Sequence, residues 1–93
     1  MQISDSAKIK VGTNALIQKV SEEMVILDSE SGQYYTLNEV ASDMLSKLQN
    51  GQTVSETADY ICSEYNATQE EVLADIKEMI QHLVNKELVS IAE

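Results

Sequence analysis

The sequence has no Arg, Pro, Trp or Phe, and its 93 residues include one Cys and one His. A lone Cys excludes an intramolecular disulfide, and with it the small secreted proteins that depend on disulfides. The opening residues lack the apolar run of a signal peptide, and no apolar stretch is long enough to cross a bilayer. We therefore expect a cytoplasmic protein with no membrane partner.

Positive charge is also scarce. Sixteen acidic residues face six Lys, for a net charge of −10. Residues 1–20 carry a net +2, with three Lys and one Asp, whereas residues 21–93 carry −12, with three Lys and fifteen acids. Such a surface repels phosphate backbones, and the absence of Arg removes the best bidentate phosphate contact. Nucleic acid is excluded as an expected partner, and this disfavours a DNA-reading winged helix.

Three segments in the first half have the residue pattern of β-strands. Residues 15–20, 24–28 and 33–37 are rich in apolar, β-branched and aromatic side chains. Gly32, just before the third segment, can adopt the positive φ that a tight turn requires. The pattern predicts a three-stranded antiparallel meander.

After Leu37 the apolar period changes from 2 to 3.6, which is typical of helices. Asn38 stands where an N-cap belongs, and Thr53 and Thr68 each open a capping-box pattern. The sequence thus predicts three helices, of which the last, residues 69–86, has the widest apolar stripe.

The order of strands followed by helices predicts an α+β fold, with helices packed on one face of a small sheet. We expect a single domain over residues 15–92, preceded by a loosely held N-terminal arm at residues 1–14. Short strands are predicted at residues 8–11 and 88–92.

His and Cys, which commonly act as catalytic bases and nucleophiles, each occur only once in the sequence. His82 lies among core positions of the last helix, and Cys62 lies on the apolar stripe of the second, so both are expected to be structural. We expect no enzyme activity, no cofactor and no metal. A hydrolase would have to lose turnover on the substitution His82→Ala. A phosphopantetheine carrier is disfavoured because neither Asp5-Ser6 nor Asp28-Ser29 precedes a helix.

The third strand, residues 33–37, has an outer edge without Lys, Pro or charge. Proteins usually protect such edges. An undefended edge beside a long apolar helix can accept a peptide as an added strand.

The middle of the chain has a familiar order of residues. "VILDSESGQYYTLNEVASDML" is followed by "LQNGQTVSETADYICSEYNATQEEVLADIKEMIQHLVNKELV". Over residues 15–91 the chain resembles the coenzyme PQQ synthesis protein D family, also called the RiPP recognition element (RiPPs are ribosomally made, modified peptides). The matching positions are Leu27-Asp28, Gly32, Tyr35-x-Leu37-Asn38, Ala41, Gly51, Tyr65, Asp75 and Leu88-Val89. The chain departs from the pattern at Glu87, where a Gly is usual.

The resemblance implies a winged-helix-like domain that binds the leader segment of a ribosomally made precursor peptide. In that family the leader adds as a strand beside the third strand, packs against the last helix, and is delivered to a modifying enzyme. That enzyme is a radical SAM enzyme or the peptidase and cyclase of lasso-peptide clusters. The peptide-binding residues that the resemblance implies are Gln33, Tyr34, Tyr35, Thr36, Leu37, Asp75, Ile76, Met79, Ile80 and Leu83.

One further class stays open. An acidic interaction or oligomerisation domain with no peptide ligand has the same composition, and dimerisation through the exposed edge is one form of it. Genes for a short precursor and a modifying enzyme beside this one would favour the peptide-binding hypothesis.

Overall fold

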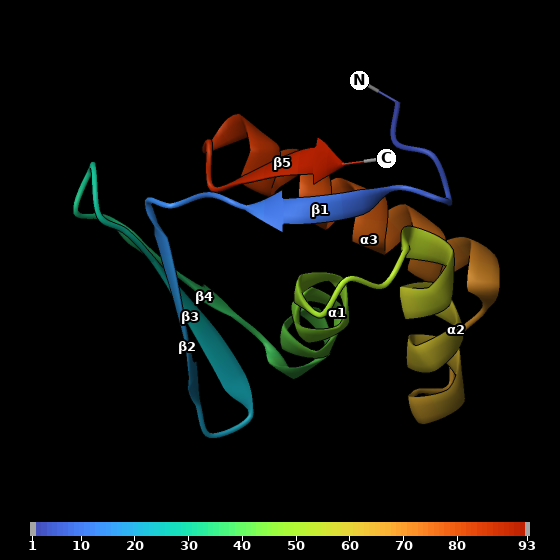
Figure 1. The fold of residues 1–93 in the computed structure, drawn as a ribbon. Helices are drawn as coiled ribbons and strands as arrows, with labels where there is room; N and C mark the ends of the chain where they lie inside the picture. Colours follow the sequence, from blue (N-terminus) through green and yellow to red (C-terminus); the bar gives the residue numbers. More distant parts are fainter. Residues whose placement is uncertain (1, 93) are drawn as a thin grey trace.

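The computed structural model describes residues 2–92 and has the predicted α+β fold (Figure 1). Three strands and three helices follow the predicted order, with one further strand near each end of the chain. The elements are β1 (Lys8–Val11), β2 (Ala15–Val20), β3 (Glu23–Asp28), β4 (Tyr34–Leu37), α1 (Glu39–Gln49), α2 (Val54–Glu64), α3 (Gln69–Asn85) and β5 (Val89–Ala92).

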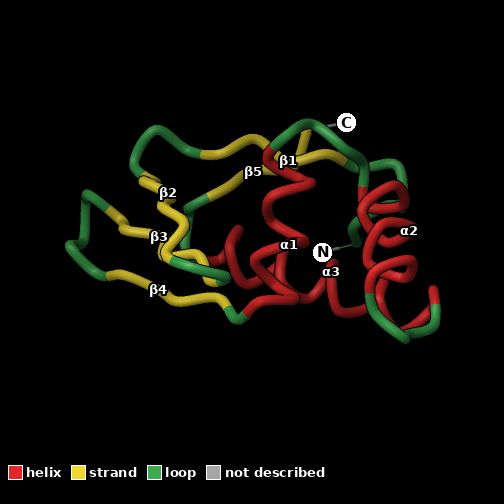
Figure 2. Tube along the Cα trace, turned by 90° about the horizontal axis from the view of Figure 1, so that it is seen from below, coloured by secondary structure: helices red, strands yellow, loops and turns green. Residues whose placement is uncertain are grey.

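The predicted meander is confirmed as an antiparallel sheet in the order β2-β3-β4. Figure 2 shows this sheet at one end of the molecule and α2 at the other, with α1 and α3 between them. The face of the sheet toward the helices carries apolar side chains, and the pairing Ile17↔Ile26↔Tyr35 forms one row across it. Ile26 is almost completely buried. The sheet is therefore covered by helices on one face only.

Helix α1 is joined to the sheet through the buried side chain of Ser42. The Met24 amide donates to the Ser42 hydroxyl at 2.8 Å, and this hydroxyl donates to the Leu37 carbonyl at 3.1 Å. Met24 and Leu37 are register partners of β3 and β4. The hydroxyl thus bridges the two strands at the point where β4 ends, which fixes the short join between β4 and α1.

The predicted helix starts are confirmed. Asn38 Oδ1 accepts from the Ala41 amide at 2.9 Å. Thr53 and Glu56 form a complete capping box. At Thr68 the side chain accepts from the Glu71 amide, while the Glu71 carboxylate contacts the Thr68 hydroxyl rather than its amide. These local bonds satisfy amides that a helix start leaves free.

The N-terminal segment packs into the core, so the expectation of a loosely held arm is wrong for its described part. Ile3, Ala7 and Ile9 are buried. Strand β1 pairs antiparallel with β5 in a separate two-stranded sheet. Apolar residues at alternate positions supply the physical reason, because leaving them in water would cost the free energy of their burial. The domain boundary at residues 14 and 15 stays a prediction.

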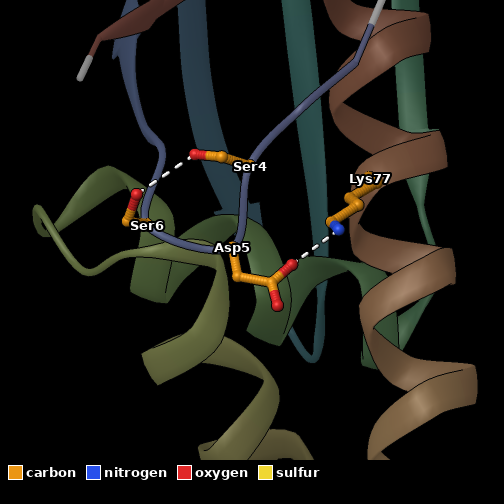
Figure 3. Close-up of polar contacts among 4 residues, drawn as sticks. All are labelled: Ser4, Asp5, Ser6 and Lys77. Carbon is orange, nitrogen blue, oxygen red and sulfur yellow. Dashed lines mark hydrogen bonds and ion pairs between the residues drawn. The ribbon is translucent and has the colours of Figure 1, made fainter.

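Polar contacts also hold this segment. The carbonyls of Asp5 and Ala7 accept from the Ser55 and Val54 amides, at 2.8 and 2.9 Å, at the start of α2. Asp5 also forms a 2.6 Å ion pair with Lys77 of α3 (Figure 3). The segment thereby ties the first turn of α2 to the middle of α3.

No helix within residues 2–92 combines the length and the apolar character needed to span a bilayer.

Candidate functional site

The free edge of β4 presents the backbone of two residues. The Asp28 amide donates to the Gln33 carbonyl at 2.8 Å. Because the backbone groups of successive residues in an antiparallel strand point to opposite sides, Gln33 and Tyr35 face β3. Tyr34 and Thr36 then direct their amides and carbonyls away from the sheet. Within the described chain no other strand pairs with β4 on that side.

A groove of about 530 Å³ lies between β4 with the start of α1 on one side and α3 on the other. Tyr35 and Leu37 extend into it from β4, and both are half-buried. The Tyr35 hydroxyl donates to Gln33 Oε1 at 3.0 Å, and Lys86 Nζ lies 4.8 Å from the centre of the Tyr35 ring. The ring therefore forms one end of the groove, held between its own strand and the end of α3.

The structure brings half of the predicted peptide-binding residues together around the groove. The members of the predicted set that line it are Tyr35, Leu37, Asp75, Met79 and Leu83. Ile76 and Ile80 are completely buried and lie in the core. Gln33, Tyr34 and Thr36 are exposed along the strand and do not line the groove. Tyr34 is 69% exposed and points to the outer face of the sheet.

Sequence reasoning missed the other residues that line the groove. These are Asn38, Val40, Ala41, Met44, Glu78, His82 and Lys86. Val40, Ala41 and Met44 follow the apolar period of α1, and the same helix face also meets the groove. A signal for α3 was available, because Asp75, Glu78, His82 and Lys86 follow one another at three- and four-residue steps on one helix face.

A single asparagine links the β3–β4 turn to the end of α3. Asn14 Nδ2 donates to Asp28 Oδ1 and to the Glu87 carbonyl, both at 3.2 Å. The turn starts β4, and Glu87 follows the last residues of α3. α3 thus ends near the point where β4 begins, and Figure 1 shows α3 running toward that end of the molecule while β4 runs away from it toward α1. The two elements therefore run in roughly opposite directions.

Asp28 organises that turn. The hydrogen bond from Asn14 is the main cause that lowers the pKa of Asp28 below its usual value, and the Glu30 amide adds to it at 3.0 Å. Ser31 Oγ donates to the second carboxylate oxygen at 3.0 Å. The ionised carboxylate is therefore the form that the folded turn favours.

The side chain with the largest shift in pKa, Tyr65, lies away from the groove and has a structural role. The Tyr65 hydroxyl donates to Asp43 Oδ2 at 2.6 Å and joins the end of α2 to α1. This hydrogen bond is the main cause that raises the pKa of Tyr65. Neither residue lines the groove.

The described residues contain no group of three or more His, Cys, Asp or Glu placed to hold a metal ion. The groove combines an apolar floor with charged side chains at its rim, and an open strand edge runs beside it. This arrangement suits an extended peptide, because its backbone can pair with the edge while alternate side chains enter the groove.

The chain is similar to two solved structures and to one family profile. A solved structure described as TbiB1 in complex with the TbiA(beta) leader peptide is 31% identical, with a TM-score of 0.82 over 87% of this chain and 94% of that chain. A second, described as lasso peptide synthetase B1 complexed with the leader peptide, is 23% identical and shares the fold, with a TM-score of 0.83 over 89% of this chain and 98% of that chain. Among proteins with curated descriptions, no sequence matches. The sequence profile of coenzyme PQQ synthesis protein D (PqqD) matches residues 23–89, and the chain therefore belongs to the PqqD family.

Proposed function

We propose that this protein binds the leader segment of a ribosomally made precursor peptide. The leader adds as a strand to the free edge of β4, and its alternate side chains enter the groove against α3. The observation that carries this proposal is the open backbone of Tyr34 and Thr36 beside an apolar groove. It is supported by the similarity to TbiB1, which was solved with a leader peptide bound.

The binding site divides into two parts. Tyr34 and Thr36 contribute backbone groups, and the side chains of Tyr35, Leu37 and Met79 form the apolar surface. Asp75 and Leu83 complete the α3 wall. Ile76 and Ile80 support that wall from beneath, and Gln33 orients the Tyr35 ring.

We propose that the protein is not itself an enzyme and that it presents the bound peptide to a modifying enzyme in the cytoplasm. Its described residues offer an extended binding surface rather than a cluster of acid, base and nucleophile. That partner is a leader peptidase and cyclase or a radical SAM enzyme, the two kinds of modifying enzyme that the family resemblance implies.

The substitution Met79→Asp tests the groove. Met79 is half-buried in the groove wall, so a carboxylate there would have to lose its water shell when a peptide binds. We expect a fluorescently labelled leader, taken from a precursor gene beside this one, to bind the wild type saturably and to lose binding to the variant. Fluorescence anisotropy measures this.

Ala74→Asp is the matched control, because Ala74 is an exposed α3 residue outside the groove. This variant should bind like the wild type, and circular dichroism should show both variants folded. Unchanged saturable binding by Met79→Asp would contradict the groove assignment.

A second candidate function is suggested by the outer face of the sheet. Leu16, Leu27 and Tyr34 are paired across the three strands, and all three are exposed. Such an apolar row could associate with a second copy, although the net charge of −10 opposes this. A monomer in light scattering at every concentration tested would exclude a homodimer.

A further inference from the structure

The rim of the groove is charged, and the sign of the charge changes along it. Asp75 and Glu78 line the groove on the α3 side in the middle of that helix. Lys86 lines it at the end of α3, over the Tyr35 ring. All three side chains are exposed, so they are available to a bound peptide. One end of the groove is therefore acidic and the other is basic.

The direction of a guest strand follows from the sheet. All pairs in the β2-β3-β4 sheet are antiparallel, and antiparallel pairing is the more stable arrangement. A strand added to β4 in the same manner runs opposite to β4. Because α3 also runs opposite to β4, the guest runs in the same sense as α3. Its N-terminal part then lies near Glu78, and its C-terminal part lies near Lys86.

The spacing of the charges fits the alternation of a strand. Glu78 and Lys86 are eight residues apart on the helix, which is about 12 Å along its axis. An extended strand covers that length in about four residues. Since side chains at positions i, i+2 and i+4 share one face of a strand, three guest side chains can meet the acidic end, the apolar middle at Met79 and the basic end.

We propose that the groove selects leader segments with a basic residue, an apolar residue two positions later and an acidic residue two positions after that. This inference rests on the proposed function and specifies the peptide that the site prefers. Opposite charges at both ends also fix the direction of the guest strand, because the reversed peptide places like charges together at each end.

Selection from a phage-displayed peptide library tests this order of charges. The library carries short peptides with a fixed central Leu and random residues two positions before and after it, and the immobilised full-length protein is the bait. We expect the order base-Leu-acid to be enriched over acid-Leu-base by about 3-fold to 10-fold, as expected for two exposed charge pairs. The preference should shrink in high salt.

A charge exchange provides the decisive variant. The double substitution Glu78→Lys with Lys86→Glu keeps the net charge and should reverse the preferred order. The matched control is Lys19→Glu with Glu22→Lys, an exposed pair near the β2–β3 turn and outside the groove, and it should leave the order unchanged. Circular dichroism checks that both proteins fold.

The outcomes separate the two proposals. Two outcomes would overturn the proposed charge order and leave peptide binding intact. One is enrichment of peptides with no preferred order of charges, and the other is enrichment of the same order by the wild type and by the exchanged variant. Enrichment of acid-Leu-base on the wild type would overturn the direction of the guest strand. No enrichment of any peptide over an empty surface would contradict the proposed function as well.

Discussion

The two edges of the three-stranded sheet differ in charge, in backbone pairing and in what lies beside them. On β2 the outward backbone groups belong to Ala15, Ile17 and Lys19, since the Ser29 amide bonds to the Asn14 carbonyl and fixes the alternation. The Ala15 amide is already bonded to the Gly12 carbonyl at 3.1 Å, and Lys19 adds a charge. The β4 edge has neither feature and lies beside the groove.

This difference makes β4, and not β2, the edge at which we expect a peptide to add. A charged side chain and an occupied amide are common ways to block an edge strand. An open edge alone gives backbone pairing without selectivity, whereas an apolar groove beside it adds pockets for alternate side chains. β4 has both, and Ser42 holds it in place.

The largest expected effect comes from blocking the β4 edge with Thr36→Pro. Proline removes the outward amide and places its ring where the guest backbone would lie, while the bonds to β3 come from other residues. We expect leader affinity, measured by fluorescence anisotropy, to fall at least about tenfold. Lys19→Pro makes the same change at an outward position of β2 and should bind normally. Equal loss in both variants would contradict the assignment of the β4 edge.

The next effect concerns the anchor of β4. Ser42→Ala removes the hydroxyl that satisfies both the Met24 amide and the Leu37 carbonyl. The free energy of unfolding in urea should fall by about 1–3 kcal/mol. Ser46→Ala, also on α1, changes a side chain for which the described residues offer no hydrogen bond, and it should cost far less. Equal losses would show that the bridge contributes nothing specific.

A smaller effect is expected from the turn that starts β4. Because the pKa of Asp28 is lowered in the folded state, its contribution is present at neutral pH and is lost as the pH falls through the folded pKa. Urea unfolding of the wild type should therefore weaken below about pH 4. Asp28→Asn should have a lower free energy of unfolding at neutral pH than the wild type. Its free energy of unfolding should also fall less steeply as the pH is lowered. Glu22→Gln, in the β2–β3 turn, is the control and should keep the wild-type dependence of stability on pH. If Asp28→Asn lost stability in acid as steeply as the wild type, this role of Asp28 would be contradicted.

The smallest expected effect is a gain in stability from a substitution just after the end of α3. Glu87 has φ 59°, in the left-handed region that favours glycine. Glu87→Gly should raise the free energy of unfolding by about 0.5–1 kcal/mol. Ser21, in the β2–β3 turn, has φ 61°, and Ser21→Gly should give a similar gain. A loss of stability at Glu87 would show that its side chain matters more than the backbone strain.

Local patterns allowed most of the fold to be predicted. The β-type composition of residues 15–20 and the caps at Asn38 and Thr53 depend only on neighbours in the chain. The pairing of β1 with β5 could not be derived in the same way, because Ile9 and Ile91 are partners from opposite ends of the sequence. For this reason the N-terminal segment was expected to be loose.

The candidate site could be predicted only in part. The edge at Thr36 and the wall at Met79 followed from the uncharged strand, the apolar helix and the family resemblance. Lys86 and His82 were missed as groove residues because their three- and four-residue spacing indicates a shared helix face but not what that face meets. Ile76 was placed in the site by the family resemblance, and its position on an apolar stripe does not distinguish a core residue from a groove wall.

Amide hydrogen exchange of the wild type, followed by NMR with and without the leader peptide, is the sharpest test of strand addition at β4. We expect the Tyr34 and Thr36 amides to become protected when the peptide binds, because they gain hydrogen-bond acceptors. The Ile17 and Lys19 amides on the β2 edge should exchange at unchanged rates. Saturable binding that leaves Tyr34 and Thr36 unprotected, or that protects the β2 edge instead, would contradict strand addition at β4.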